Sequence, residues 1–261
     1  MGGVARMRIM EFTRSILKGV EVKLCRNDAH AYKPHVHHEL SLGYIVEGAT
    51  DLTLTNGIVR IGAGDGVVIP PLTTHICAPH DENRWAYVML FIDPGYYGSV
   101  VNFRLARKLS ADETGELIGF IDRLLREKDP DALENTLIEL LLEFEENGAT
   151  DTQETLSDAV QEIHAYIVDH AAEEISLEKL EIFSGLNRFS IIRNFKKQYG
   201  TTPAAFHLQC RVAQAKELMN KGADVLDACT ALGFYDQAHF IREFKKMYGV
   251  TPGKYAGQLM R

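Results

Sequence analysis

The sequence has few cysteines and no long hydrophobic run. Its four cysteines never show CxxC spacing, so they indicate neither a zinc knuckle nor a disulfide framework, and we expect them to be small core residues. They are Cys25, Cys77, Cys210 and Cys229. The most apolar helical stretch, LIELLLEF, is interrupted by Glu139 and Glu143, and the first residues hold no apolar segment of signal-peptide length. These absences predict a cytoplasmic chain that does not span a membrane.

The sequence also lacks an excess of basic residues, because its net charge is −8. The charge is unevenly distributed. Residues 1 to 154 carry 15 Lys and Arg against 24 Asp and Glu, whereas residues 155 to 261 carry 13 against 12. A polyanion would be repelled by the first part and tolerated by the second, provided that the basic side chains there gather on one face. Only the C-terminal part is therefore a candidate for nucleic-acid binding.

The residue pattern of the N-terminal part, up to residue 147, changes once. From about Leu17 to Asp93, short β-like runs alternate with turns rich in Gly, Asn-Gly and Pro-Pro, which predicts a small antiparallel barrel or sandwich. From residue 111 to residue 147, apolar residues recur at helical spacing on both sides of Asp129-Pro130, which predicts a helical hairpin. The leucines of this hairpin could form a dimer surface or could pack on the barrel.

The last third of the chain is helical with frequent turns. The expected helices cover residues 155–170, 176–183, 188–199, 203–220, 224–231, 235–248 and a short segment from about 252. The whole chain is thus expected to be α+β with two domains. We divide it into a β-barrel at 1–108, a hairpin and linker at 109–154 and an all-α domain at 155–261.

The all-α domain contains one sequence motif twice. Residues 193 to 203 read RNFKKQYGTTP and residues 242 to 252 read REFKKMYGVTP. Each copy follows a short helix and a turn at Gly185 or Gly233, which is the helix-turn-helix plan in which the second helix enters the DNA major groove. Cations at a helix C-terminus also suit the helix dipole, but two copies in the same context favour DNA binding.

Residues 158 to 258 resemble the double helix-turn-helix domain of AraC/XylS-type bacterial transcription regulators. The second copy, GFYDQAHFIREFKKMYGVTPGKY, is similar to the most recognisable signature of that family, and the first copy follows the same frame more loosely. The resemblance implies that two recognition helices enter successive major grooves, about 34 Å apart, and that a long helix from about Pro203 to Asn220 joins them.

Helix phase predicts which side chains touch DNA. With Ile191 and Phe195 inward in the first copy, and Phe240 and Phe244 inward in the second, the outward residues are the readers. The predicted DNA-binding residues are Arg188, Phe189, Ile192, Arg193, Lys196, Lys197, Gln237, Ala238, His239, Ile241, Arg242, Lys245 and Lys246. Phe189, Ile192 and Ile241 could instead be packing residues.

The N-terminal part resembles the cupin barrel, as the sensory domains of AraC-type regulators commonly do. Residues 34 to 48, PHVHHELSLGYIVEG, carry the His-x-His of the first cupin motif, and residues 62 to 79 carry a Gly-Asp turn, a Pro and a later His. The Glu that metal-binding cupins place after the second His is replaced here by Ser41 or Leu42. The resemblance implies a small-molecule sensor, with no cofactor expected.

We expect the effector pocket to be lined by His35, His37, Glu39, His75, Trp85 and Tyr87. On a regular strand His35, His37 and Glu39 share one face, so Glu39 would favour a cationic ligand. His35 and Glu39 would stand about 13 Å apart, too far for one metal, whereas His35 and His37, about 7 Å apart, could share a metal with His75. We expect His30, His38 and His80 to be solvated or to satisfy barrel hydrogen bonds.

The favoured function is a sequence-specific transcription regulator whose barrel senses a small-molecule effector, and not an enzyme. The expected partners are double-stranded operator DNA, the effector and a second copy of the chain in a homodimer, with RNA polymerase left open and no membrane. Two alternatives remain: a metal-sensing regulator that uses the three histidines, and a cupin enzyme fused to a DNA-binding module. The enzyme is weakened by the missing Glu.

Overall fold

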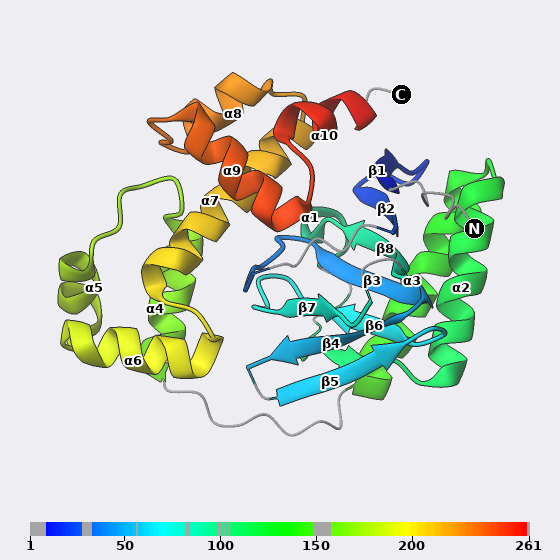
Figure 1. The fold of residues 1–261 in the computed structure, drawn as a ribbon, viewed down its shortest axis with the longest axis horizontal. Coiled ribbons are helices and arrows are strands. Elements are labelled where there is room, and N and C mark those ends of the chain that lie inside the picture. Colours follow the sequence, from blue (N-terminus) through cyan, green and yellow to red (C-terminus); the bar gives the residue numbers. More distant parts are fainter. Residues whose placement is uncertain are drawn as a thin grey trace, which may run out of the picture.

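A computed structural model describes residues 9–27, 33–55, 57–81, 84–98, 101, 103, 105–148 and 158–259. The N-terminal half is built on antiparallel strands, and the C-terminal half is a group of helices that lies against one end of them (Figure 1). The expected α+β class with two domains is confirmed. His30, one of the histidines expected to be solvated, lies outside the described residues.

Two antiparallel sheets form the N-terminal domain. The larger sheet has the order β1-β2-β8-β3-β6-β9 and the smaller has the order β5-β4-β7. Their bounds are β1 Ile9–Arg14, β2 Val20–Arg26, β3 Leu40–Glu47, β4 Ala49–Leu54, β5 Gly57–Gly62, β6 Gly66–Ile69, β7 Ile76–Pro79, β8 Ala86–Ile92 and β9 Arg107–Lys108. Strand β4 alternates in burial, with Thr50, Leu52 and Leu54 inward, as a strand with one solvated face must.

The helical hairpin covers the outer face of the larger sheet. After the short α1 Pro94–Tyr97, helix α2 Ala111–Arg126 and helix α3 Pro130–Gly148 run along that face (Figure 1). Their inward leucines and phenylalanines form one buried cluster with Leu42, Val68 and Leu90 of the sheet. The buried face of the hairpin therefore packs on the sheet, while Ile118, Leu125 and Leu142 stay exposed.

Among the described residues, the C-terminal helices lie within three residues of their expected bounds. They are α4 Asp158–Asp169, α5 Leu177–Ser184, α6 Arg188–Tyr199, α7 Pro203–Asn220, α8 Val225–Ala231, α9 Gln237–Tyr248 and α10 Pro252–Leu259. The repeated Tyr-Gly is a helix stop, because Gly200 and Gly249 adopt the left-handed conformation at φ 70° and 79°. The repeated Thr-Pro starts the next helix, since Pro203 and Pro252 are the first residues of α7 and α10.

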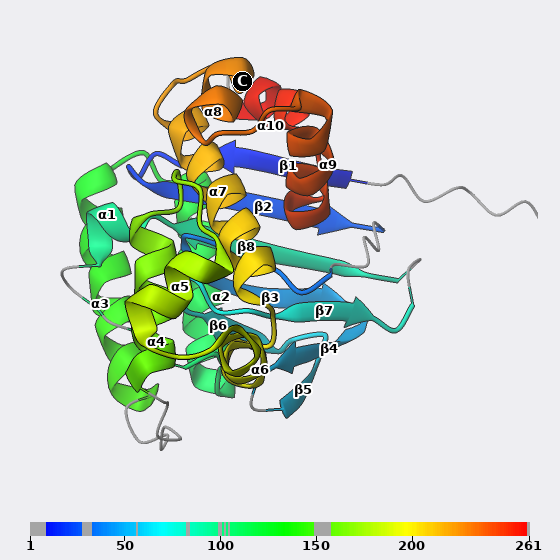
Figure 2. The same cartoon turned by 90° about the vertical axis from the view of Figure 1, so that its left-hand side faces the viewer.

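The two domains are closely packed on one another. Helices α7, α9 and α10 lie against the end of the sheets where β1 and β2 run (Figure 2). One hydrophobic cluster contains Phe12 and Phe91 of the sheet together with Tyr248 and Tyr255 of the helices. Arg14 also donates a hydrogen bond of 2.7 Å to the carbonyl of Asn220. None of the described helices is long and apolar enough to cross a membrane.

Candidate DNA interface and ligand cavity

The first candidate reading helix, α6, is held by a turn that the sequence encodes locally. Ser176 caps α5, Gly185 ends it at φ 70°, and the Asn187 side chain accepts the backbone N–H of Ser190 to start α6. Small polar N-caps and a left-handed glycine are the residues that such a turn requires. Ile191 and Phe195 are fully buried, so the expected phase of α6 is correct.

The opposite face of α6 carries most of the predicted reading residues. Arg188, Phe189, Arg193, Lys196 and Lys197 are exposed, and Ile192 is half-buried. The ring of Phe189 is 78% exposed, so it is not a core residue of this chain. One of these cations is already engaged: Arg188 lies 3.0 Å from the carboxylate of Glu181 on the preceding helix.

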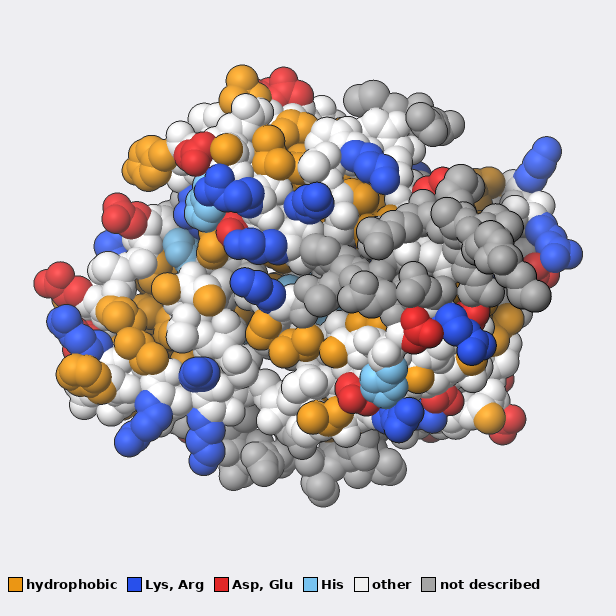
Figure 3. Space-filling model, in the orientation of Figure 1, with side chains coloured by type: hydrophobic (Ala, Val, Ile, Leu, Met, Phe, Trp, Pro, Cys, Tyr) orange, Lys and Arg blue, Asp and Glu red, His pale blue; other side chains and the backbone are white. Residues whose placement is uncertain are grey.

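The second candidate reading helix, α9, repeats the arrangement. Gln237, Ala238, Arg242, Lys245 and Lys246 are exposed, whereas His239 and Ile241 are half-buried. Lys and Arg side chains gather over α9, and others lie more scattered around α6 (Figure 3). One exposed residue at this surface was not predicted. Tyr235, just before α9, is fully exposed, and its only signal in the sequence is an aromatic residue in a turn.

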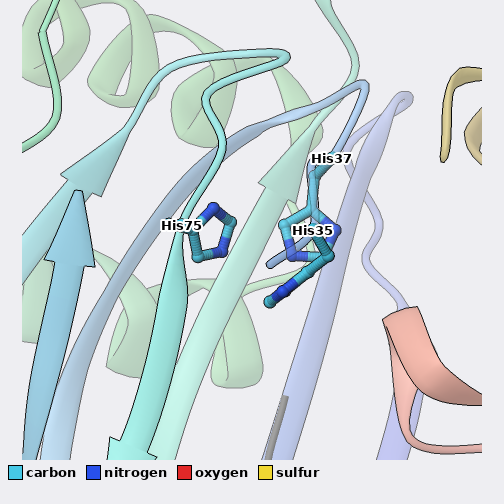
Figure 4. A group of neighbouring side chains, drawn as sticks. All are labelled: His35, His37 and His75. Atoms are coloured by element: carbon cyan, nitrogen blue, oxygen red, sulfur yellow. The ribbon is translucent and has the colours of Figure 1, made fainter. Parts of the chain in front are cut away.

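Three histidines meet at one end of the sheets. His35 and His75 exchange two backbone hydrogen bonds of 3.1 and 3.0 Å as an isolated antiparallel bridge, which brings the two cupin-like motifs side by side. The ring centroid of His35 lies 4.3 Å from that of His75 and 4.8 Å from that of His37. One nitrogen from each of the three side chains lies within 4.8 Å of the others (Figure 4).

All three histidines are buried, and their surroundings keep two of them neutral at pH 7. Burial lowers the pKa of His75 to about 4, and burial together with the neighbouring histidines lowers that of His37 well below its usual value. The Nδ1 atoms of His35 and His75 each lie 2.9 Å from a backbone carbonyl. A carbonyl can only accept, so both Nδ1 atoms carry a hydrogen, and the Nε2 atom of neutral His75 keeps a lone pair.

A cavity between the two sheets opens next to these histidines. Its polar lining includes Lys23, Ser41 and Thr50, and its aromatic lining includes Trp85 and Tyr87. The remaining wall is mostly aliphatic. The hydroxyl oxygens of Ser41 and Thr50 and the Nδ1 of His37 are buried without a hydrogen-bond partner among the described residues. Buried polar atoms in this condition are costly unless a ligand or water satisfies them.

The expectation that Glu39 shares a face with the two histidines is wrong, and the physical reason is local. Residues 36 to 39 are not in a strand, since β3 begins only at Leu40, so the side chains do not alternate regularly there. Glu39 points away from the cavity and accepts a hydrogen bond of 2.6 Å from Lys216. Lys23, which the sequence did not indicate, lines the cavity instead. The charged side chain in the cavity lining is therefore positive and not negative.

Lys216 and its partners form an ionic cluster between the domains that sequence reasoning also missed. The ammonium of Lys216, on α7, is fully buried and lies 3.2 Å from Glu21 and 2.6 Å from Glu39, both on the sheet domain. The Tyr255 hydroxyl of α10 donates to Glu21 at 2.5 Å. Burial alone would lower the pKa of Lys216, but the two carboxylates outweigh it and raise that pKa.

The other predicted histidines lie outside the cavity. His38 is 3.9 Å from Glu217 of α7, and His80 is 3.0 Å from Asp51 on the smaller sheet. Both side chains are partly exposed. The four cysteines are free; three are buried and Cys77 is half-buried beside the cavity.

Comparison with known families matches both halves of the chain. Residues 18–143 match the family described as AraC-like ligand binding domain, and residues 183–258 match a helix-turn-helix domain family. YbfI, an uncharacterized HTH-type transcriptional regulator of Bacillus subtilis, is 27% identical over 78% of this chain and 80% of its own length. The HTH-type transcriptional activator RhaS of an Enterobacter species is 26% identical over 79% of this chain and 81% of its own.

Solved structures show the same fold over nearly the whole chain. An apo variant of ToxT from Vibrio cholerae matches with a TM-score of 0.64 at 15% identity, over 94% of this chain and 100% of that one. Wild-type ToxT with a bound unsaturated fatty acid matches with a TM-score of 0.63 at 14% identity, over 97% of this chain and 98% of that one. The shared order is a ligand-binding sheet domain followed by paired helix-turn-helix units.

Proposed function

Because this chain belongs to the AraC family of DNA-binding transcription regulators, we propose that both of its reading helices contact operator DNA and that an anionic small molecule occupies its cavity. The observation that supports DNA binding is that two helices have the same arrangement of buried and exposed faces. Each has a buried aromatic face and an opposite face with exposed Arg and Lys, and α7 joins the two units.

The roles of the reading residues follow from their chemistry. Arg193 and Arg242 suit the O6 and N7 atoms of guanine, and Gln237 suits adenine. The paired lysines at the end of each helix suit phosphates, which fix register without reading sequence. The remaining members of the proposed interface are Arg188, Phe189, Ile192, Lys196, Lys197, Ala238, His239, Ile241, Lys245 and Lys246.

The DNA proposal is tested by selecting duplexes from a random library with the full-length protein and measuring affinity by fluorescence anisotropy. We expect Arg193→Ala and Arg242→Ala each to weaken binding by about tenfold or more, corresponding to roughly 1–3 kcal/mol for a base contact. Arg126→Ala, an exposed arginine on the hairpin, is the matched control and should bind normally. Unchanged affinity in both reading variants would reject the assignment.

The chemistry of the cavity supports an effector with an apolar body and an anionic end. The aliphatic wall suits the body, and the buried ammonium of Lys23 suits a carboxylate. Ser41 and Thr50 offer further hydrogen bonds. The fatty acid named for ToxT has the same two parts, which is consistent with this ligand class. The proposed ligand is anionic, whereas the expected position of Glu39 had favoured a cationic ligand.

Differential scanning fluorimetry tests the effector class, because a ligand that binds only the folded state raises the melting temperature. Alkyl and aryl carboxylates should stabilise the full-length protein, and the amines of the same carbon skeletons should not. Lys23→Gln should remove the shift. Stabilisation by the amines alone would reverse the proposed charge, and no shift from any carboxylate would remove the ligand class.

We further propose a homodimer, a cytoplasmic location dictated by the DNA partner and no catalytic activity. Ile118, Leu125 and Leu142 are the exposed apolar side chains of the hairpin and the proposed contact between copies. Light scattering of the Leu125→Glu variant against wild type tests the dimer. Contact with RNA polymerase remains open to a transcription assay.

A further inference from the structure

We propose that His35, His37 and His75 bind one divalent first-row transition-metal ion, for which zinc is the probe, and that this ion is part of the sensory site. The inference deepens the proposed function, because it rests on the same cavity being the sensor. It starts from an arrangement that a packed core does not need: three imidazoles from two separate loops, buried together, with a nitrogen from each within 4.8 Å of the others (Figure 4).

The orientation of the rings supports ligands rather than core histidines. Metal-binding histidines usually donate the second ring N–H to a carbonyl or carboxylate, which fixes the tautomer and turns the other nitrogen to the metal. His35 and His75 do so to the carbonyls of Lys33 and Thr73, each at 2.9 Å. The backbone bridge between the same two residues holds both rings on one side. In both rings Nε2 is therefore the nitrogen that remains for a metal ion.

His37 supplies the third nitrogen and a second, independent observation. It is 7% exposed, and its Nδ1 has no hydrogen-bond partner among the described residues. An unsatisfied nitrogen costs free energy in a buried site, and a metal ion would remove that cost. Three imidazoles suit zinc, copper, iron and nickel better than magnesium or calcium, which prefer oxygen.

Tetrahedral zinc with Zn–N bonds of about 2.0–2.1 Å places two nitrogen ligands roughly 3.3 Å apart. The present separations of up to 4.8 Å therefore require a small rotation of the rings. Three protein ligands leave one position for a water or an effector, as in zinc sites that exchange a ligand. That position would be filled from the cavity, since all three histidines line it.

Charge decides what else the site would take. The ammonium of Lys23 lines the same cavity as the three histidines, so it would repel a dication placed there. No carboxylate is among the described residues that line the cavity, so an acidic ligand for the fourth position of the ion would come from the effector. The metal and a carboxylate effector should therefore strengthen each other's binding, by the same factor in both directions.

The site also touches the DNA-binding domain. The ring of His37 lies 5.6 Å from the ring of Tyr248, the last residue of the second reading helix. An ion that turns His37 would change a contact at the base of α9. This contact gives the proposed metal a direct route to the orientation of the reading helix.

The test uses full-length protein treated with EDTA and dialysed, titrated with zinc against a fluorescent chelator. We expect one zinc ion per chain. His35→Ala, His37→Ala and His75→Ala should each weaken binding by more than about 100-fold, since losing even an outer-shell partner costs about 10–100-fold. His80→Ala, a histidine outside the cavity, is the matched control and should bind as wild type does.

Failure of the variants to fold is checked by circular dichroism of the metal-free proteins. Cobalt(II) bound to wild type gives a measurement that needs no variant: intense visible bands indicate nitrogen ligation at low coordination number, and the weak bands of an octahedral aquo-like site would overturn the proposal. Zinc affinity that is absent in wild type, or that survives in all three variants, would overturn it as well.

The metal inference and the proposed function fail separately. Operator binding and carboxylate stabilisation are measured on the metal-free protein, so they succeed or fail without zinc. Retained operator binding with no zinc site would leave the regulator and remove the metal. A zinc site in a protein that selects no DNA sequence would do the reverse.

Discussion

At the scale of single residues, the proposed DNA contacts depend on exposed side chains of the reading helices. Phe189 is the clearest case, because a large aromatic ring that is 78% exposed contributes nothing to the core, and its helix carries basic residues on the same face. Burying such a ring against a partner is worth about 1.5–3 kcal/mol. We propose that the ring packs on thymine methyl groups in the major groove.

We expect Phe189→Ala to lower operator affinity by about tenfold or more and to leave the melting temperature unchanged, because the ring has little contact within the chain. Anisotropy titration and scanning fluorimetry of the same preparations measure both quantities. Ile182→Ala removes an equally exposed apolar side chain from α5, outside the reading helix, and should leave both quantities unchanged. A loss of stability in Phe189→Ala would mean that the ring packs within the chain.

Two glycines should respond in opposite ways to substitution by alanine. Gly48 has φ +89°, and a Cβ there would lie 1.9 Å from the carbonyl oxygen of Arg84. Gly119 lies within α2 with open space around its Cβ position. We expect Gly48→Ala to destabilise the fold by more than about 2 kcal/mol and Gly119→Ala to stabilise it by about 0.5–1 kcal/mol. Urea unfolding of each variant checks the two signs; Gly48→Ala with wild-type stability would contradict the backbone geometry.

At the scale of elements, one carboxylate ties three of them together. Glu113 forms a capping box with Ser110 at the start of α2 and accepts two hydrogen bonds of 2.9 and 2.7 Å from Arg107 of β9. Arg107 also donates to the carbonyl of Phe144 on α3. The hydrogen bonds from Arg107, partly opposed by burial, lower the pKa of Glu113 to about 2.

The direction of this pKa shift determines how the stability contribution of Glu113 depends on pH. The unperturbed value is 4.5, so the carboxylate's contribution is complete above about pH 4.5 and is lost as the pH falls toward 2. We expect Glu113→Gln to cost roughly 3 kcal/mol at pH 7 and much less near pH 2. Urea unfolding across that range measures it. Glu116→Gln, exposed on the same helix, is the control, and a pH-independent loss in Glu113→Gln would reject the ionic explanation.

At the scale of the whole molecule, the buried Lys216 connects the two domains. Its ammonium faces Glu21 and Glu39. Burial alone raises the pKa of both carboxyls; for Glu39 the ammonium outweighs burial and the pKa is lowered, whereas for Glu21 it stays raised. The contribution of Glu39 is therefore complete above about pH 4.5 and is lost below it. That of Lys216, whose pKa is raised, is lost only above about pH 10.5.

We expect Lys216→Met to destabilise the domain contact by about 3–5 kcal/mol, because it leaves two buried carboxylates without their cation. Urea unfolding gives the loss, and a larger radius of gyration in X-ray scattering would show that the domains separate. Adding Glu21→Gln and Glu39→Gln to the same chain should recover part of the loss. Lys254→Met, exposed on α10, is the control. If the Lys216→Met variant kept its stability and its radius of gyration, the apolar contacts alone would hold the two domains together.

The sequence by itself determined the elements that local interactions specify. Helices α5, α6 and α9 begin at small polar caps and end at left-handed glycines, all within a few residues, so their phase and outward faces could be predicted. The α+β class and the paired helix-turn-helix units followed from the same local signals. The reading residues stay a prediction until DNA is measured.

Only the tertiary structure decided which distant residues meet. The bridge between His35 and His75 joins positions forty residues apart, and the irregular backbone before β3 turned Glu39 toward Lys216 instead of the histidines. Lys23 and Lys216 gave no signal in the sequence, since a lysine is ordinarily exposed and only burial against specific partners makes it informative. Long-range pairing and burial are properties of the packed chain, and a local pattern does not contain them.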